Sequence, residues 1–457
     1  MIIDLDRFSP SWGTLRRGLD ELGGVSHGAA GLGVQISGRV EQVVGLVIEA
    51  VVPEARIGAL YQIEIPGRPP LIAEVVGFKP DAALMMPLGE IEGVRQGCLV
   101  HPMKSRAVAP VGPALLGRAI DGLGRPLDGG PPPEVERWAP LYATPPNPMT
   151  RRAVDTPLSL GVRAVDALLT CGRGQRMGIM AGSGVGKSTL LGMMARQTEA
   201  DINVIALIGE RGREVRNFVE RDLGPEGMAR SVLVVATSDT APLIRMRAAW
   251  LATTIAEYFR GQGQDVLLMM DSLTRFAMAQ REVGLAVGEP PTTRGYTPSV
   301  FTLLPRLLER AGNDHGPGSL TGLYTVLVEG DDMNDPIGDA ARAILDGHIV
   351  LSRDLAARAH YPSIDVLQSA SRCMNEVVVP GHRQAAGVVR RLMATWREVE
   401  DLIRIGAYKQ GSDPRADQAV ASIEAVNMLL QQGVDEDAGL DRAVKQLVGI
   451  AQKAGQV

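Results

Sequence analysis

Cysteine, aromatic residues and surplus positive charge are all scarce in this sequence of 457 residues. The three cysteines, Cys98, Cys171 and Cys373, lie far apart and form no C-x-x-C pair, which argues against a disulfide framework and against a zinc site. A formal net charge of −5 provides no general basic field that would hold nucleic acid. These scarcities indicate a protein whose cysteines are reduced thiols and which does not bind its partners through a large excess of positive charge.

Long apolar runs are missing as well. The longest, such as 232-VLVVA and 266-VLLMM, fall far short of the ~20 residues that a membrane-spanning helix needs. The beginning of the chain carries acids and arginines where a secretory signal would need an apolar stretch. We therefore expect a cytosolic protein that meets a membrane only through other proteins.

The chain is too long for one ordinary core, and its residue patterns divide it into segments. In the first, Trp12, Leu15, Leu19 and Leu22 share one helical face. Such a helix either packs on its own body or docks a partner, and the pattern leaves both open. The segments are an N-terminal segment (1–30), a small β-barrel domain (31–105), a linker and the start of the core (106–157), an α/β domain (158–375) and a helical domain (376–457).

Short Val- and Ile-rich runs within residues 34–103, broken by proline and glycine, predict the strands of a small barrel. Barrels of this size often bind nucleic acid through aromatic side chains, but this one offers only Tyr61 and Phe78. A structural or assembly role is therefore favoured for it.

Fully apolar strands alternate with helical patterns from about 158 to 375, which predicts a parallel sheet covered on both faces. Beyond residue 376 the chain turns helical, with Val388, Leu392 and Trp396 at helical spacing. We expect the last helix to run through residues 416–430.

The stretch 178-GIMAGSGVGKSTLLGMMAR-196 resembles a phosphate-binding loop, except that Ala181 stands where G-x-x-x-x-G-K-[ST] begins with glycine. In such a loop, backbone N–H groups point at an anion and the following helix adds its dipole. Lys187 is placed to reach the β- and γ-phosphates of ATP, and the Ser188 hydroxyl to ligate Mg²⁺. The nucleotide-binding residues predicted here are Gly182, Ser183, Gly184, Val185, Gly186, Lys187, Ser188 and Thr189.

Three further residues predict hydrolysis rather than mere binding. Asp271 ends an apolar strand, where a partner for Mg²⁺ belongs. Glu210 stands at the tip of another strand, where a carboxylate can deprotonate the attacking water; an ion pair with Arg211 or Arg213 is the alternative. Arg372 follows a run of small residues and could reach a neighbouring subunit's phosphate as an arginine finger.

Long contiguous motifs support these assignments, and together they resemble the type III secretion ATPase family, which includes the flagellar protein-export ATPase and the injectisome ATPase. That family is similar in turn to the catalytic subunit of rotary ATP synthases, and the resemblance runs from about residue 25 to 457. The motifs are AGSGVGKSTLL, GERGREV, LMMDSLTRFAMAQREVGLAVGEPPTTRGYTPSVF, LLPRLLERAG, LVEGDDMNDPI, ILDGHIVLSRDLA and HYPSIDVLQSASR.

The resemblance implies an α/β fold in which a RecA-like P-loop central domain lies between an N-terminal small β-barrel and a C-terminal helical domain, assembled as a homohexamer. It implies that Glu210 activates the water, that Arg211 helps hold the phosphate network and that Arg372 is a finger contributed in trans. Tyr361 would stack on adenine, and Ala181 is a form that the family uses.

The implied partners are a peripheral-stalk regulator that contacts the N-terminal segment, a central coiled-coil stalk, the export gate at the membrane and chaperone–substrate complexes. The chain would be cytoplasmic and associate with the inner-membrane export apparatus through them. The residues within these motifs resemble those of the flagellar branch more than those of the injectisome branch. A hexameric nucleic-acid translocase and a non-catalytic ring subunit are alternatives; the acidic charge argues against the first and Glu210 against the second.

Overall fold

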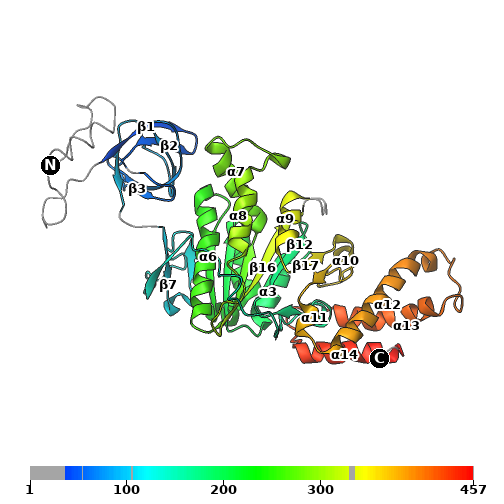
Figure 1. Cartoon of the computed structure of the whole chain (residues 1–457). Helices are drawn as coiled ribbons and strands as arrows, with labels where there is room; N and C mark the ends of the chain where they lie inside the picture. Colours follow the sequence, from blue (N-terminus) through cyan, green and yellow to red (C-terminus); the bar gives the residue numbers. More distant parts are fainter. Residues whose placement is uncertain (1–36, 54, 104–106, 329–334, 456–457) are drawn as a thin grey trace. The chain divides into compact units, whose positions relative to one another are not determined.

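The structure is a computed structural model, and it describes residues 37–53, 55–103, 107–328 and 335–455 in two compact units (Figure 1). The units divide between Ala107 and Val108. The helix predicted on Trp12, Leu15, Leu19 and Leu22 lies outside the described residues. Among the described residues, no helix is both long and apolar enough to span a bilayer.

The first unit contains a closed six-stranded barrel with the strand order β1-β2-β5-β4-β3-β6, which confirms the predicted small barrel. All its strand pairs are antiparallel, and alternate apolar side chains such as Ile48, Ile63 and Val100 fill the interior. Tyr61 is buried in this core, so of the two barrel aromatics only Phe78 is exposed. The strands are β1 (Gly38–Val44), β2 (Val47–Val51), β3 (Leu60–Ile63), β4 (Leu71–Phe78), β5 (Ala83–Pro87) and β6 (Leu99–Pro102).

The second unit is built on an eight-stranded sheet with the order β18-β17-β12-β16-β15-β13-β14-β8. Every neighbouring pair in it is parallel except β17 with β18, as the alternating pattern predicted. Its strands are β8 (Ala119–Asp121), β12 (Arg176–Ala181), β13 (Ile202–Ile208), β14 (Ser231–Ala236), β15 (Asp265–Asp271), β16 (Ser319–Leu327), β17 (Gly347–Leu351) and β18 (Ala370–Ser371).

Helices cover both faces of this sheet, because its central strands are apolar on both. Side chains at alternate positions, such as Met177 and Ile179 of β12, join one core with α3, and the residues between them are buried as well. The helix α6 packs along β13, β14 and β15, and α7 packs beside it. The helices are α2 (Arg163–Leu168), α3 (Lys187–Gln197), α4 (Gly212–Asn217), α5 (Gly224–Ala229), α6 (Pro242–Gly261), α7 (Leu273–Ala286), α8 (Pro298–Leu308), α9 (Pro336–Ile344), α10 (Arg353–Ala357) and α11 (Met374–Val377).

Short elements join these layers. The segment predicted as a linker and the start of the core contains strands: β7 (Val108–Val111) pairs with β9 (Arg137–Pro140), and β8 adds an edge strand to the main sheet. β10 (Pro157–Leu158) pairs with β11 (Cys171–Gly172). Short 3₁₀ turns occur at Pro113–Leu115 and Thr293–Gly295, and a π-helical turn occurs at Phe218–Leu223.

Three helices close the chain: α12 (Pro380–Arg404), α13 (Pro414–Leu430) and α14 (Leu440–Lys453). Val388 and Leu392 of α12 are buried in the same core as the P-loop strand, while Trp396 packs partly buried at its edge. The prediction that the helix through residue 430 is the last one was wrong. α14 packs Ala443, Leu447 and Ala451 against α2 and α12, and these residues recur every four positions, a helical pattern that the sequence does carry.

Candidate active site

The predicted phosphate loop connects β12 to α3 as a tight turn. Gly184 and Gly186 adopt φ of 79° and 88°, left-handed values that favour glycine, and Lys187 begins α3 directly after them. Ala181 instead belongs to β12, where its carbonyl accepts a hydrogen bond of 3.0 Å from the N–H of Val328. The departure from the usual pattern therefore falls on an extended residue that does not need the freedom of glycine.

Two residues far along the chain pack against this loop. The Ser363 hydroxyl donates a hydrogen bond of 2.7 Å to the carbonyl of Val185, which is buried. The Tyr361 ring lies beside Gly186, because a Cβ placed on that glycine would be 3.7 Å from two ring carbons. Tyr361 is 46% exposed, so part of its ring remains open at the loop.

Around the loop, Gly182 is buried while Ser183, Gly184 and Ser188 are exposed, and Thr189 is half-buried. The Ser188 side chain thus lies in the first turn of α3, next to Lys187.

Lys187 brings the two predicted carboxylates together. Its Nζ forms an ion pair with Asp271 at the end of β15 and lies 3.5 Å from Oε1 of Glu210, which follows β13. The hydroxyl of Thr325 donates a hydrogen bond of 2.6 Å to Asp271, which is 4% exposed. The carboxyl ends of parallel strands meet at one edge of a sheet, so β12, β13 and β15 bring Lys187, Glu210 and Asp271 together there.

The pKa of Glu210 is shifted by its surroundings. Burial, together with a hydrogen bond to Glu214, raises the pKa of Glu210 to about 7, although the positive charge of Lys187 opposes the shift. The pKa of Glu214 is lowered, chiefly by the same hydrogen bond. A carboxyl that titrates near neutral pH is suited to take a proton from water.

The two predicted arginines lie elsewhere. Arg211 caps α4 with an 82% exposed side chain whose guanidinium is 3.8 Å from Glu214, not paired with Glu210. Arg372 follows β18, and its N–H bonds the carbonyl of Asp346, just before β17. Ala181, where the phosphate loop begins, pairs with Leu351 of β17. Leu351 lies five residues along the chain from Asp346, which bonds the Arg372 backbone. At ~3.3 Å per residue, roughly 17 Å therefore separates the backbone of Arg372 from its own subunit's loop.

Four residues around the site were not predicted from the sequence: Glu214, Arg275, Thr325 and Ser363. Thr325 had a visible signal, because it is a polar residue inside an apolar strand. Arg275, four residues after Asp271, packs its aliphatic part on Gly209, and its buried Nε has no hydrogen-bond partner among the described residues. Ser363 gave no signal, because only the folded chain brings it to Val185. Glu214 stands four residues after Glu210, which is the spacing of one helical turn.

Within the residues that the structure describes, no cluster of three or more His, Cys, Asp or Glu side chains is suited to hold a metal ion alone. Mg²⁺ bound with a nucleotide does not require one, since phosphate oxygens and waters supply most of its ligands. The oxygen donors of Ser188 and Asp271 fit that kind of site.

A glycine-rich loop between a strand and a helix, with carboxylates at the tips of neighbouring strands, defines a P-loop nucleotide hydrolase. Comparison with known families agrees with this class. The ATP synthase alpha/beta family matches with its beta-barrel domain over residues 40–104 and its nucleotide-binding domain over 161–371, and the T3SS EscN ATPase C-terminal domain matches over 378–449.

The flagellum-specific ATP synthase of Bacillus subtilis is 52% identical over 416 residues, which cover 90% of this chain and 94% of that protein. The type 3 secretion system ATPase of Xanthomonas euvesicatoria is 51% identical over 418 residues, covering 91% and 94%. The assembled ATPase EscN of enteropathogenic E. coli, solved in complex with its central stalk EscO, matches with a TM-score of 0.84 and 48% identity over 90% of this chain and 99% of that chain. The chain therefore belongs to the family of flagellum-specific ATP synthases and type 3 secretion system ATPases.

Proposed function

We propose that this chain hydrolyses ATP as one subunit of a homohexameric ring that drives protein export through a type III apparatus, and that the apparatus is the flagellar one. Family membership supports export, since the matched relatives are named as flagellar or type 3 secretion ATPases. The observation that carries hydrolysis is Glu210 beside Lys187, with its pKa raised to about 7.

In this proposal ATP lies on the phosphate loop, with its β- and γ-phosphates on the backbone N–H groups of residues 182–189 and on the ammonium of Lys187. That ammonium exchanges its ion pair with Asp271 for phosphate oxygens. Adenine stacks on Tyr361, whose ring is close to Gly186 and partly exposed.

The Glu210 carboxylate orients and deprotonates the attacking water, and Glu214 accepts the hydrogen bond that sets the acidity of that carboxyl. Arg211, at the start of α4, joins the phosphate network. Mg²⁺ neutralises phosphate charge when it is bound, and Ser188 and Asp271 are the residues that would hold it.

Arg372 acts in trans. Its place at the far end of the sheet from its own loop supports this role, because the guanidinium cannot serve both ends of one subunit. In a closed ring, each subunit then offers a phosphate loop on one side and a finger on the other.

We further propose that the ring contacts a central coiled-coil stalk, as EscN contacts EscO, together with the export gate and chaperone–substrate complexes. Residues 1–30 would dock the peripheral-stalk regulator. The chain would be cytoplasmic and reach the inner membrane through these partners. The barrel exposes Phe78 but buries Tyr61, which offers little surface for stacking bases and disfavours a nucleic-acid translocase.

Deleting the gene tests the flagellar assignment. Loss of external filaments and motility, restored by the wild-type gene and not by Glu210→Gln, is the expected result. Intact motility with loss of needle-substrate secretion would assign the chain to the injectisome branch instead. Strong stimulation of the purified ATPase by RNA, steeply dependent on salt, would contradict protein export.

A further inference from the structure

Arg372 extends from a very short element. β18 has two residues, Ala370 and Ser371, and pairs antiparallel with β17 at the edge of the sheet. The Arg372 side chain is exposed, and its guanidinium donates a hydrogen bond of 3.2 Å to the carbonyl of Arg342. A strand of two residues forms few backbone hydrogen bonds, so the position of Arg372 depends on the side chains that pack against β18.

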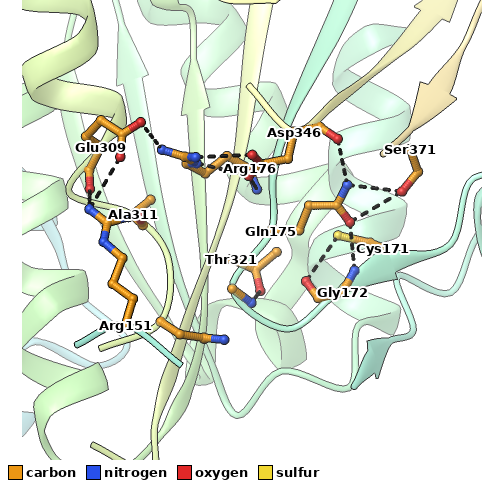
Figure 2. Close-up of polar contacts among 12 residues, drawn as sticks. Arg151, Cys171, Gly172, Gln175, Arg176, Glu309, Ala311, Thr321, Asp346 and Ser371 are labelled. Atoms are coloured by element: carbon orange, nitrogen blue, oxygen red, sulfur yellow. Dashed lines mark hydrogen bonds and ion pairs between the residues drawn. The ribbon is translucent and has the colours of Figure 1, made fainter. Parts of the chain in front are cut away.

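Gln175, which is fully buried, lies directly behind β18 (Figure 2). Its amide nitrogen donates 3.0 Å to the Ser371 hydroxyl and 3.1 Å to the carbonyl of Asp346, and its amide oxygen accepts 2.8 Å from the N–H of Gly172. The same Asp346 carbonyl accepts 2.9 Å from the N–H of Arg372. Gln175 and the finger backbone therefore share one acceptor.

The Asp346 side chain fixes that acceptor in place. Its two carboxylate oxygens accept 3.0 and 3.1 Å bonds from the guanidinium of Arg176, and one of them also accepts 3.1 Å from the Arg176 N–H. Arg176 in turn forms an ion pair of 2.6 Å with Glu309 (Figure 2). Paired, two-pronged contacts of this kind restrict orientation more than single hydrogen bonds do.

Gly347 shows how closely β18 is held against this support. A Cβ on Gly347 would lie 2.5 Å from the carbonyl oxygen of Ala370 and 3.1 Å from Cα of Ser371. No side chain fits between the two strands there, so a shift in Asp346 or Gln175 is passed to the backbone of residues 370–372.

We propose that Asp346 and Gln175 are positioning residues that hold Arg372 for the neighbouring subunit's active site. This inference rests on the proposed action of Arg372 in trans. Arg176 and the phosphate loop lie at opposite ends of β12. The same strand therefore positions the subunit's own phosphate loop at one end and, through Arg176 and Asp346, the Arg372 that acts in the neighbouring subunit at the other. Loss of Asp346 or Gln175 therefore lowers hydrolysis in the neighbour's site and not in the subunit's own.

The test is steady-state ATP hydrolysis by the full-length assembled protein with Asp346→Asn, which removes a carboxylate acceptor of the Arg176 fork. We expect kcat to fall roughly 10- to 100-fold, the effect of a small misplacement, with KM for ATP little changed. Ser371→Ala should act in the same direction more weakly. Ser369→Ala is the matched control, because it removes a hydroxyl with two similar bonds, to Val350 and Asp365, that do not contact Gln175.

Two readouts separate positioning from a general loss of structure. In the Arg372→Ala background, Asp346→Asn should cause no further loss; an equal loss in both backgrounds would overturn the inference. Mixing Asp346→Asn subunits with Glu210→Gln subunits should restore hydrolysis, because the latter lend intact fingers. If Arg372→Ala is rescued by that mixing and Asp346→Asn is not, the defect lies in the subunit's own site and the inference fails. Wild-type activity of Arg372→Ala would instead refute the finger itself.

Discussion

The acidity of Glu210 makes a prediction about pH. With a pKa of about 7, its carboxylate is roughly half formed at pH 7 and decreases about tenfold for each pH unit below. Because the deprotonated form is the base, kcat/KM, which reports the free enzyme, should rise about tenfold from pH 6 to pH 8. Replacing the base by Glu210→Gln should lower turnover roughly 10²- to 10⁴-fold while ATP still binds, since the phosphate loop is intact.

The assay is hydrolysis across pH 5.5 to 9 at saturating and limiting ATP, in buffers of constant ionic strength. The nucleotide is a necessary control, because a terminal phosphate itself ionises at about pH 6. If the fall in rate at low pH is due to Glu210, it should be absent from the pH profile of the residual activity of Glu210→Gln. If it is due to ATP, it should persist in that variant.

Glu214→Ala tests what raises the pKa of Glu210. The hydrogen bond and the charge of Glu214 both raise the pKa of Glu210, so Glu214→Ala should move the acid limb to lower pH. An acid limb near the ordinary value of 4.5 in the wild type, or one unchanged in Glu210→Gln, would refute the assignment of the base.

Five other substitutions, at four positions, test the nucleotide site. Ala181→Gly should leave KM for ATP near wild type, because residue 181 is extended, whereas Gly186→Ala, at φ of 88°, should weaken binding by ~1–3 kcal/mol, measured by calorimetry. Tyr361→Ser should raise the Kd for ATP roughly 10- to 100-fold while Tyr361→Phe does not, if adenine stacks there. Thr325→Val, which removes the hydrogen bond to Asp271, should lower kcat by a factor corresponding to ~1–2 kcal/mol; unchanged rates would show that the bond has no role in turnover.

The sequence could predict the elements of this site because each stands at a boundary between patterns. The apolar runs fix β12, β13 and β15, and their carboxyl ends must meet in a parallel sheet, so Lys187, Glu210 and Asp271 had to converge. The glycines of the loop follow the same logic, since Gly184 and Gly186 hold the left-handed angles that the turn requires.

Contacts between distant segments could not be predicted in this way. Ser363 meets Val185 across 178 residues, and Gln175 meets Ser371 across 196, with no periodicity that relates them. The pKa of Glu210 depends on burial and on a helical turn that places Glu214 beside it. The helix α14 was not predicted although its buried residues recur every four positions, so the sequence did carry a helical pattern there.

In the proposed mechanism, one subunit's carboxylate and its neighbour's arginine form a single active site. Mixing two inactive variants, Glu210→Gln and Arg372→Ala, tests it most directly. In rings assembled from equal amounts, about one interface in four joins an intact site to an intact finger, so ATP hydrolysis should reappear at roughly a quarter of the wild-type rate. A mixture that stays as inactive as its components, although mixed rings form, would show that the two residues do not act in one shared site.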